Sequence, residues 1–269
     1  WNGGRINLAA DVSSQFVSSI IISAPYAKNQ VTLNLESKAQ VVSKQYIDIT
    51  LKVMKLFGVE VIKKAPNTFV IPQKPYTNPS IVQVEGDATN ASYHLALAAV
   101  TGGTVTVNNI GSESMQTDAN FCSILQKMGC AMKQTRTTTT ITGPKPIVPD
   151  PSGGSVVDSK NQLRAIPGKI DMGSMTDAFM TLAAVASLAV GTTTITNIKN
   201  QKYKDCDRIS VMLSQLRNVG VSCEMLEDSS GIKIHGNPKL RNRAARKTTF
   251  INPHDDSRIA MSFSILGSA

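Results

Sequence analysis

The stretch of sequence that decides the fold occurs twice: Gly103-Thr104-Val105-Thr106-Val107-Asn108-Asn109-Ile110 and Gly191-Thr192-Thr193-Thr194-Ile195-Thr196-Asn197-Ile198. The two copies lie 88 residues apart, and their runs of Thr, Val and Ile predict a β-strand in each. Self-similarity at a fixed spacing is the sequence signature of a repeated structural unit. We therefore expect the chain to be built from copies of one supersecondary unit.

A second repeated pattern predicts a helix after each strand. Apolar residues stand seven, four and one positions before a glycine in three places: Leu51, Met54 and Phe57 before Gly58; Cys122, Leu125 and Met128 before Gly129; Leu213, Leu216 and Val219 before Gly220. This spacing is typical of one face of an amphipathic helix that ends at a glycine. A short strand is expected after each glycine, at residues 59–62, 130–132 and 221–225.

A more uniformly apolar helix is predicted upstream of each copy. These helices open with small polar residues that make good N-caps: Ser13-Ser14-Gln15, Asp87-Ala88-Thr89-Asn90 and Thr176-Asp177. We expect these inner helices to be covered on all sides, within an α/β repeat. A fourth opening at residues 255–263 lies close to the last residue, Ala269, and the chain starts at Trp1. We therefore expect a segment of a longer protein.

Composition limits the class of protein. The 269 residues are 41% hydrophobic, which fits one large or two small globular domains and excludes a disordered or fibrous chain. The bend at residues 84–87 is the predicted domain crossing. The apolar stretch near residues 178–190 is too short to span a bilayer, and no signal peptide is evident, so an intracellular, cytoplasmic protein is expected.

The four cysteines show no CxxC spacing and are predicted to be buried thiols. With only three histidines beside them, no metal site is expected, and no cofactor is predicted.

The net charge of +9 indicates an anionic partner, which could be nucleic acid, a membrane surface or a phosphorylated small molecule. The densest basic run, residues 239–247, has no interleaved aromatic residue for base stacking, so we predict a solvated loop there rather than a nucleic-acid site. The Pro- and Gly-rich residues 143–154 are predicted to form a surface loop. Neither nucleic acid nor a membrane is therefore expected as a partner.

Polar loops precede two of the three amphipathic helices, at residues 42–46 and 204–208. They carry hydroxyl, amine and guanidinium groups where unpaired N–H groups and the helix dipole favour an anion. Two interpretations remain open on these residues alone: a phosphate or carboxylate site, or ordinary helix capping.

Five separated motifs are similar, in the same order, to those of EPSP synthase, 3-phosphoshikimate 1-carboxyvinyltransferase. They are Ser13-Ser14-Gln15-Phe16, Val84-Glu85-Gly86-Asp87-Ala88 and the stretches 171–179, 200–208 and 255–263. The amino-acid sequence at residues 175–179, 206–209 and 231–236 most resembles that of the EPSP synthase domain of the fungal pentafunctional AROM polypeptide.

The resemblance implies a two-domain inside-out α/β barrel of repeated βαβαββ units, truncated at both ends in this segment. Residues 1–84 would be the C-terminal part of the upper domain, and residues 85–269 most of the lower domain, incomplete at its C-terminus. The implied reaction transfers the enolpyruvyl group of phosphoenolpyruvate to the 5-hydroxyl of shikimate 3-phosphate. The implied partners are these two substrates and covalently fused neighbouring shikimate-pathway domains.

The resemblance also implies a role for each matching side chain. Ser13, Ser14 and Ser43 would bind the phosphate of shikimate 3-phosphate, Tyr46 would pack beside its ring and Gln15 would reach both ligands. Asn200 and Lys204 would also bind shikimate 3-phosphate, and Lys204 could supply a proton. Arg208 and Arg258 would bind phosphoenolpyruvate, because a planar guanidinium fits a carboxylate or phosphate in bidentate fashion.

Asp177 matches the general base that takes the proton of the 5-hydroxyl. The alternative for this residue is an ordinary N-cap. Three residues depart from the family pattern. Asp205 stands where a Glu usually handles the methylene proton, Lys202 replaces an Arg, and Ser257 replaces a His beside Arg258, removing a group that titrates near neutrality. We expect the nearby His254 to point elsewhere.

The family's N-terminal Lys-Ser loop, its glycine-rich phosphoenolpyruvate loop and a late Lys lie outside these residues. We therefore expect the parent protein to be active and the segment alone to be inactive. One alternative is UDP-N-acetylglucosamine enolpyruvyl transferase, which lacks the Ser-Ser-Gln signature of residues 13–15. A second is a non-catalytic remnant, suggested by Ser257 and Asp205. A nucleic-acid-binding module rests on charge alone.

Overall fold

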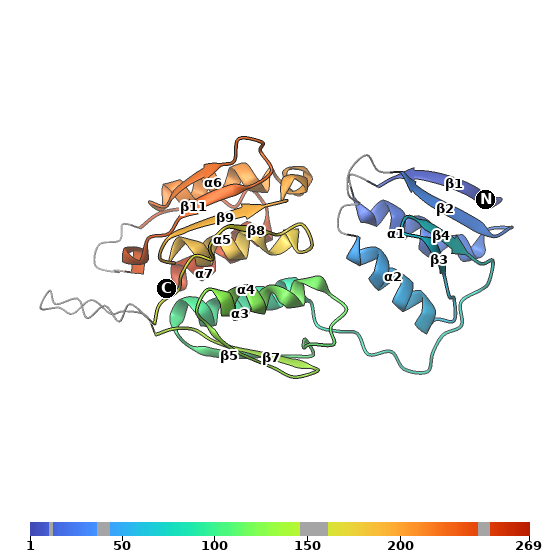
Figure 1. Cartoon of the computed structure of the whole chain (residues 1–269), viewed down its shortest axis with the longest axis horizontal. Coiled ribbons are helices and arrows are strands. Elements are labelled where there is room, and N and C mark those ends of the chain that lie inside the picture. Colours follow the sequence, from blue (N-terminus) through green and yellow to red (C-terminus); the bar gives the residue numbers. More distant parts are fainter. Residues whose placement is uncertain (11–12, 37–43, 146–160, 242–247) are drawn as a thin grey trace, which may run out of the picture. The chain divides into compact units, whose positions relative to one another are not determined.

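The computed structural model describes residues 1–10, 13–36, 44–145, 161–241 and 248–269. The chain divides into two compact units, Trp1–Val84 and Glu85–Ala269 (Figure 1). The division falls within the bend at residues 84–87, where the sequence predicts a crossing between domains.

The first unit contains one complete βαβαββ repeat. Its elements are β1 (Gly4–Ala9), α1 (Ser14–Ser23), the 3-10 helix η1 (Ala24–Tyr26), β2 (Val31–Glu36), α2 (Gln45–Leu56), β3 (Ile62–Ala65) and β4 (Thr68–Ile71). The sheet order is β1-β2-β4-β3, with β1 parallel to β2 and β4 antiparallel to both of its neighbours. Val31, Leu33 and Leu35 alternate along β2 and face the core, as a half-buried strand requires.

The first half of the second unit contains a three-stranded antiparallel sheet. Its elements are α3 (Ala88–Thr101), β5 (Thr104–Asn108), η2 (Thr117–Asn120), α4 (Phe121–Lys127), β6 (Ala131–Gln134) and β7 (Thr138–Thr142), and its sheet order is β5-β7-β6. In register, Val105 of β5 stands opposite Ile141 of β7, and Thr104 and Thr106 exchange hydroxyl hydrogen bonds with the facing threonines of β7.

The rest of the second unit repeats the topology of the first. Its elements are β8 (Lys169–Asp171), η3 (Thr176–Ala178), α5 (Phe179–Ser187), β9 (Thr192–Thr196), η4 (Lys199–Tyr203), α6 (Arg208–Asn218), β10 (Ser222–Met225) and β11 (Ile232–His235), followed by η5 (Pro238–Arg241) and α7 (Ser257–Ser268). The sheet order β10-β11-β9-β8 matches β3-β4-β2-β1, and β8 is parallel to β9 as β1 is to β2. The repeat predicted from the sequence is confirmed.

The two quoted stretches form the equivalent strands β5 and β9. Each strand is followed by an asparagine in the left-handed region, Asn109 and Asn197, both with φ of 60°. Asparagine tolerates this conformation because its short side chain bonds locally. The repeated Asn in the sequence therefore marks a repeated backbone turn.

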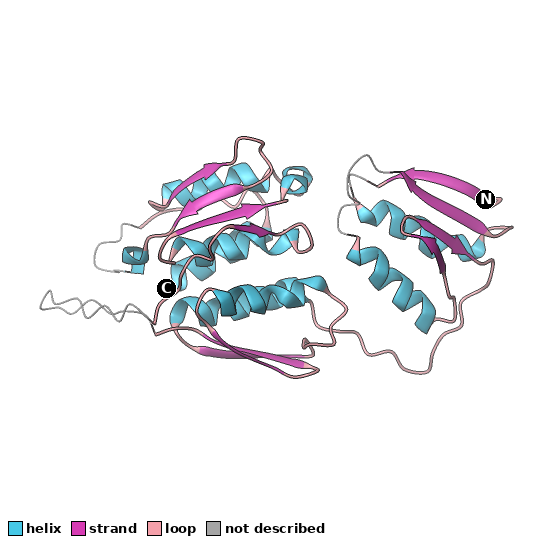
Figure 2. Ribbon diagram, in the orientation of Figure 1, coloured by secondary structure: helices cyan, strands magenta, loops and turns pink. Residues whose placement is uncertain are grey.

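The inner helices differ between the two units. In the second unit α3 and α5 lie between the two sheets, with α7 packed against both helices (Figure 2), and every residue of α5 is buried. In the first unit α1 buries only the face that contains Val17 and Ile21 and leaves Phe16 and Ile22 exposed. The expectation of helices covered on all sides is therefore confirmed for α5 and wrong for α1 and for α3, in which Asn90 and His94 are exposed.

The three predicted glycine stops are confirmed, with φ of 83° at Gly58, 110° at Gly129 and 84° at Gly220. In each case the N–H after the glycine donates to the carbonyl five residues back, as Val221 does to Leu216 at 2.9 Å. These are Schellman motifs, in which the residue after the glycine packs on the helix. The predicted strands therefore start later than expected, at Ile62, Ala131 and Ser222.

Two predicted surface loops lie largely outside the described residues. Gly143 and Pro144 are buried, and of the basic run only residues 239–241 are described, where they end η5. Arg241 donates to the carbonyl of Val100 rather than standing free in solvent.

The cysteines Cys122, Cys130 and Cys223 are buried free thiols, as predicted, but Cys206 is partly exposed. Within the described ranges, no group of three or more His, Cys, Asp or Glu side chains is placed to hold a metal ion.

Candidate active site

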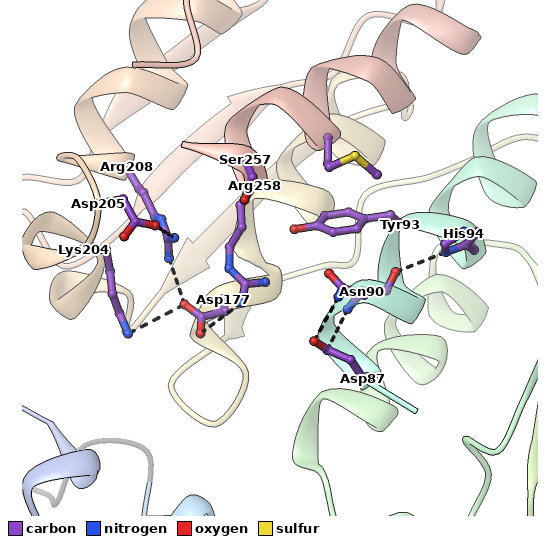
Figure 3. Close-up of a pocket in the computed structure, with 11 residues that line it drawn as sticks. Asp87, Asn90, Tyr93, His94, Asp177, Lys204, Asp205, Arg208, Ser257 and Arg258 are labelled. Atoms are coloured by element: carbon purple, nitrogen blue, oxygen red, sulfur yellow. Dashed lines mark hydrogen bonds and ion pairs between the residues drawn. The ribbon is translucent and has the colours of Figure 1, made fainter. Parts of the chain in front are cut away.

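A cavity of about 700 Å³ opens in the second unit (Figure 3). Its lining comes from the start of α3, the 3-10 helix η3, the loop before α6 and the start of α6, and the start of α7: Asp87, Asn90, Tyr93, His94, Asp177, Lys204, Asp205, Arg208, Ser257, Arg258 and Met261. Three carboxylates thus face three cationic side chains, so their formal charges cancel. The net charge of the chain is not concentrated in this cavity.

Carboxylate caps occupy the starts of three of the helices that meet here. Asp87 accepts from the N–H of Asn90 at 2.9 Å, Asp207 from that of Ser210 at 3.1 Å and Asp256 from that of Arg258 at 2.9 Å. The capping interpretation is therefore correct for the backbone N–H groups at the start of α6. The cationic side chains that line the cavity, Lys204, Arg208 and Arg258, are available to bind an anion.

Arg208 is at the centre of a buried network. Its side chain is 4% exposed and donates through Nε to Asp256 at 2.6 Å, through Nη1 to Asp177 at 3.1 Å and through Nη2 to Asp205 at 2.8 Å. Nη1 also donates to Oε1 of Gln201 at 3.0 Å. Four of its five N–H donors are thus occupied, which fixes the guanidinium plane and the carboxylates around it.

Asp177 is not a helix cap, because neither η3 nor α5 receives a capping bond from its side chain. Its Oδ1 instead accepts from Gln201 Nε2 at 3.0 Å and Arg208 Nη1 at 3.1 Å, with Lys204 Nζ at 3.9 Å. Its Oδ2 lies 3.9 Å from Arg258 Nη2. The side chain is 19% exposed, so one carboxylate oriented by three cations faces the cavity.

Arg258 is less completely paired than Arg208. Its side chain is 25% exposed, and its buried Nη1 has no hydrogen-bond partner among the described residues. Burial by itself would lower the pKa of Arg258, but the charge of Asp177, the neighbouring Tyr93 hydroxyl and the charge of Asp87 raise it, so the group stays a cation.

Asp256 Oδ2 accepts hydrogen bonds from both Arg208 and Cys206. Burial by itself would raise the pKa of Asp256, but the hydrogen bond and charge of Arg208 bring that pKa below its usual value. Burial and the adjacent Asp256 carboxylate raise the pKa of the Cys206 thiol to about 11. Cys206 is therefore a thiol at neutral pH and donates to Asp256 Oδ2 at 3.6 Å, which makes it a poor nucleophile.

The fold brings together five of the predicted site residues from the second unit: Asp177, Lys204, Asp205, Arg208 and Arg258. Asn200 stands beside them without lining the cavity. Its Nδ2 donates to Thr176 Oγ1 at 3.2 Å, and its Oδ1 is buried with no partner in the described part of the chain. Ser257 lines the cavity, whereas His254 is exposed and does not.

The other predicted site residues belong to the first unit. Ser13 caps α1 by accepting from the N–H of Gln15 at 3.2 Å, and Ser14 is buried. Gln15 is exposed, and Tyr46 lies half-buried in the first turn of α2. Ser43 lies outside the described residues.

The sequence interpretation missed the α3 wall and the residues that hold Arg208. The sequence predicts Asp87 and Asn90 only as part of a helix opening, with Asp87 also in a family motif, and it gives no role to Tyr93 or His94. The spacing of Asn90, Tyr93 and His94, at three, six and seven positions after Asp87, is a helical-face signal that could have located them. Gln201 and Asp256 carry no such signal, because their role depends on Arg208, which is distant from Asp256 in sequence.

Solved structures with the same architecture define the class of protein. EPSP synthase from Acinetobacter baumannii superposes with a TM-score of 0.68 over 99% of this chain and 56% of that chain, at 21% identity. The enolpyruvyl transferase NikO from Streptomyces tendae gives a TM-score of 0.64 over 99% and 57%, at 14% identity. The fold is therefore that of the enolpyruvyl transferases.

The family model described as EPSP synthase (3-phosphoshikimate 1-carboxyvinyltransferase) matches residues 1–269. The chain belongs to the EPSP synthase family, and the predicted resemblance and fold are confirmed.

Two similar sequences are the pentafunctional AROM polypeptides of Yarrowia lipolytica, 47% identical, and Lodderomyces elongisporus (AROM polypeptide 1), 45% identical, each over 99% of this chain. The chain spans 16% of the length of these polypeptides. None of the helices in the described ranges is long and apolar enough to cross a membrane.

Proposed function

We propose that this chain belongs to an enzyme that transfers the enolpyruvyl group of phosphoenolpyruvate to the 5-hydroxyl of shikimate 3-phosphate. The hydroxyl oxygen bonds to C2 of the enolpyruvyl group while a proton is added to its methylene carbon. Phosphate then leaves the tetrahedral intermediate, and loss of a methyl proton restores the double bond. Family membership and the charged cavity support this reaction.

The observation that carries the proposal is the position of Asp177. Its carboxylate faces the cavity, makes no structural cap and is oriented by Gln201 and Arg208 at 3.0 and 3.1 Å. A general base needs a carboxylate whose acceptor oxygen is held toward the substrate proton. We assign Asp177 that role toward the 5-hydroxyl.

Each cationic side chain of the cavity would bind an anionic group of one of the two substrates. Lys204, whose Nζ is 3.9 Å from Asp177, would contact shikimate 3-phosphate together with Asn200 and could supply a proton. Arg258 would bind phosphoenolpyruvate. Arg208 would do so only after Asp205, which is 67% exposed, gives up its bond to Nη2. Asp205 would then handle the methylene proton.

The first unit would supply the rest of the shikimate 3-phosphate site. We assign phosphate contacts to Ser13, Ser14 and Ser43, ring packing to Tyr46 and contacts with both ligands to Gln15. Ser14 is buried within the first unit, so a phosphate could contact its side chain only if the neighbouring residues moved to expose it.

We further propose the domain roles that the family fold implies. Residues 1–84 would form the C-terminal part of the upper domain and residues 85–269 most of the lower domain. By analogy with the AROM polypeptides, the chain would be fused to neighbouring shikimate-pathway domains in the cytoplasm.

The test replaces the matching segment of the Yarrowia lipolytica AROM polypeptide with this chain and measures phosphate release from both substrates. Asp177→Asn should lower the rate about 10²–10⁴-fold, since that is the usual contribution of a general base. It should leave phosphoenolpyruvate binding nearly unchanged. Asp171→Asn, which alters a carboxylate that bonds Gly173 and Asn197 and does not line the cavity, is the matched control.

An unaltered chimaera that folds and binds both substrates without turnover would favour the non-catalytic remnant. Equal loss of rate in the Asp171 and Asp177 variants would remove Asp177 from the role of base.

A further inference from the structure

Tyr93 lines the cavity from the α3 wall and has no part in the proposed reaction. The residue is 5% exposed, yet its buried hydroxyl has no hydrogen-bond partner among the residues that the structure describes. Figure 3 shows its ring extending from α3 toward Arg258, with the hydroxyl leading. A buried hydroxyl without a partner costs free energy and is rarely retained unless something bonds to it.

A second donor nearby is also without a partner. Nη1 of Arg258 is buried and unpaired in the described part of the chain, and the nearest carboxylate oxygen to this guanidinium, Asp177 Oδ2, lies 3.9 Å from Nη2. Arg258 has no acceptor atom to offer Tyr93, because a guanidinium only donates. The hydroxyl can accept from Arg258, but its own hydrogen would still need an acceptor.

The other carboxylate on this wall is already engaged. Asp87 accepts from the backbone N–H of Asn90 through Oδ1 at 2.9 Å and from its Nδ2 through Oδ2 at 3.0 Å. Tyr93 is a donor at neutral pH, because burial raises the pKa of its hydroxyl further than nearby Arg258 lowers it. Two neighbouring buried donors, the Tyr93 hydroxyl and Arg258 Nη1, are therefore without an acceptor among the described residues.

We propose that the Tyr93 hydroxyl and Arg258 Nη1 together bind one anionic group of phosphoenolpyruvate, which makes Tyr93 a further substrate-binding residue. This inference rests on the proposed function, in which Arg258 binds phosphoenolpyruvate, and adds Tyr93 as the second side chain that contacts the same anionic group. Phosphate and carboxylate oxygens each offer more than one lone pair, so one such group satisfies both donors. A neutral ligand would leave the guanidinium charge uncompensated.

The first test titrates the 269-residue chain with phosphoenolpyruvate, inorganic phosphate and pyruvate by protein-observed NMR, which measures weak affinities. Tyr93→Phe should raise the Kd of phosphoenolpyruvate about tenfold, the lower range for a hydrogen bond to a charged group. If the bound group is the phosphate, inorganic phosphate shows the same loss and pyruvate does not. If the bound group is the carboxylate, pyruvate shows the loss of affinity and inorganic phosphate does not.

The matched control is Tyr203→Phe, because Tyr203 is 76% exposed and does not line the cavity. It should bind each anion as the unaltered chain does. Combining Tyr93→Phe with Arg258→Lys should weaken binding by less than the product of the two single losses, since both side chains would contact one group.

The second test separates binding from structure through the unfolding midpoint of the ligand-free chain. Because the hydrogen of the hydroxyl has no partner among the described residues, Tyr93→Phe should leave the midpoint unchanged or raise it while anion binding weakens. A lowered midpoint with unchanged binding would show that the hydroxyl is structural and would overturn the proposal. Failure of the unaltered chain to bind phosphoenolpyruvate would also overturn this proposal, whereas the proposed function is judged by the turnover of the chimaera.

Discussion

The Arg208 side and the Arg258 side of the cavity hold the same functional group in opposite surroundings. Arg208 is 4% exposed and bonds to three carboxylates at 2.6 to 3.1 Å. Arg258 is 25% exposed, has its nearest carboxylate oxygen at 3.9 Å and keeps a buried nitrogen unpaired within the described residues. A guanidinium with its donors occupied holds the site in shape, whereas one lacking acceptors can bind an anion without first breaking protein contacts.

The largest expected effect comes from removing each arginine in turn. Arg208→Met would leave Asp256, which is fully buried, without its cation, and should cost about 3–5 kcal/mol of unfolding free energy. Arg258→Met removes no short ion pair and should cost about 1 kcal/mol or less. Urea unfolding of the two variants measures the difference. Equal losses would contradict the division of roles between the two arginines.

The next effect is a pH dependence that arises on the Arg208 side of the cavity, at Asp256. Burial by itself would raise the pKa of Asp256, but the hydrogen bond and charge of Arg208 hold it below its usual value. A carboxyl with a lowered folded-state pKa stabilises the fold above its unfolded value and loses this contribution as the pH falls through the folded value. Stability should therefore fall as the pH is lowered below about 4.

Asp256→Asn isolates this contribution. The variant should lose about 2–3 kcal/mol at neutral pH, since it weakens a buried charge-assisted pair. Its stability should change less with pH in the acid range than that of the unaltered chain. Urea midpoints at pH 3, 4, 5 and 7 provide the measurement, and parallel curves for the two proteins would show that another carboxyl controls the acid transition.

The smallest effect on stability is expected at Asp205, the exposed partner of Arg208. Asp205→Asn should change the unfolding free energy by less than about 1 kcal/mol, because the carboxylate is 67% exposed. It should also tighten phosphoenolpyruvate binding, since the Arg208 Nη2 donor no longer pairs with a carboxylate. Calorimetric or NMR titration compares the variant with Asp207→Asn, which alters the neighbouring cap of α6 and not this pair.

A weaker affinity in Asp205→Asn would show that Asp205 assists the anion rather than competing with it.

Local sequence could not distinguish the two arginines. Both stand at the start of a helix after a capping aspartate, Asp207 for Arg208 and Asp256 for Arg258. Their difference arises because Asp256 of α7 contacts Arg208 of α6 across 48 positions of sequence. Likewise Asp177 read equally well as a cap or a base, and only its contacts with Gln201 and Arg208 decide against the cap.

The fold itself was more predictable, with identifiable errors. The strands β5 and β9 and the three glycine stops follow from periodicity and backbone conformation, which are local properties. The predicted strand starts are too early, because the apolar residue after a Schellman glycine packs on the helix. In the sequence alone this residue looks like the first residue of the strand. The three-residue strand β8 exists because it pairs with β9, which a single short stretch does not reveal.

The sequence by itself determined the repeat, the family and the residue types available for anion chemistry, because periodicity, capping and motif order are written along the chain. Tertiary structure alone decided which donors are occupied. Helices distant in sequence meet at one cavity, where Arg208 bonds to three carboxylates, while Tyr93 and Arg258 keep buried donors that no other described residue pairs. Hydrogen bonding depends on distances of a few tenths of an ångström between such elements, and no local pattern encodes those distances.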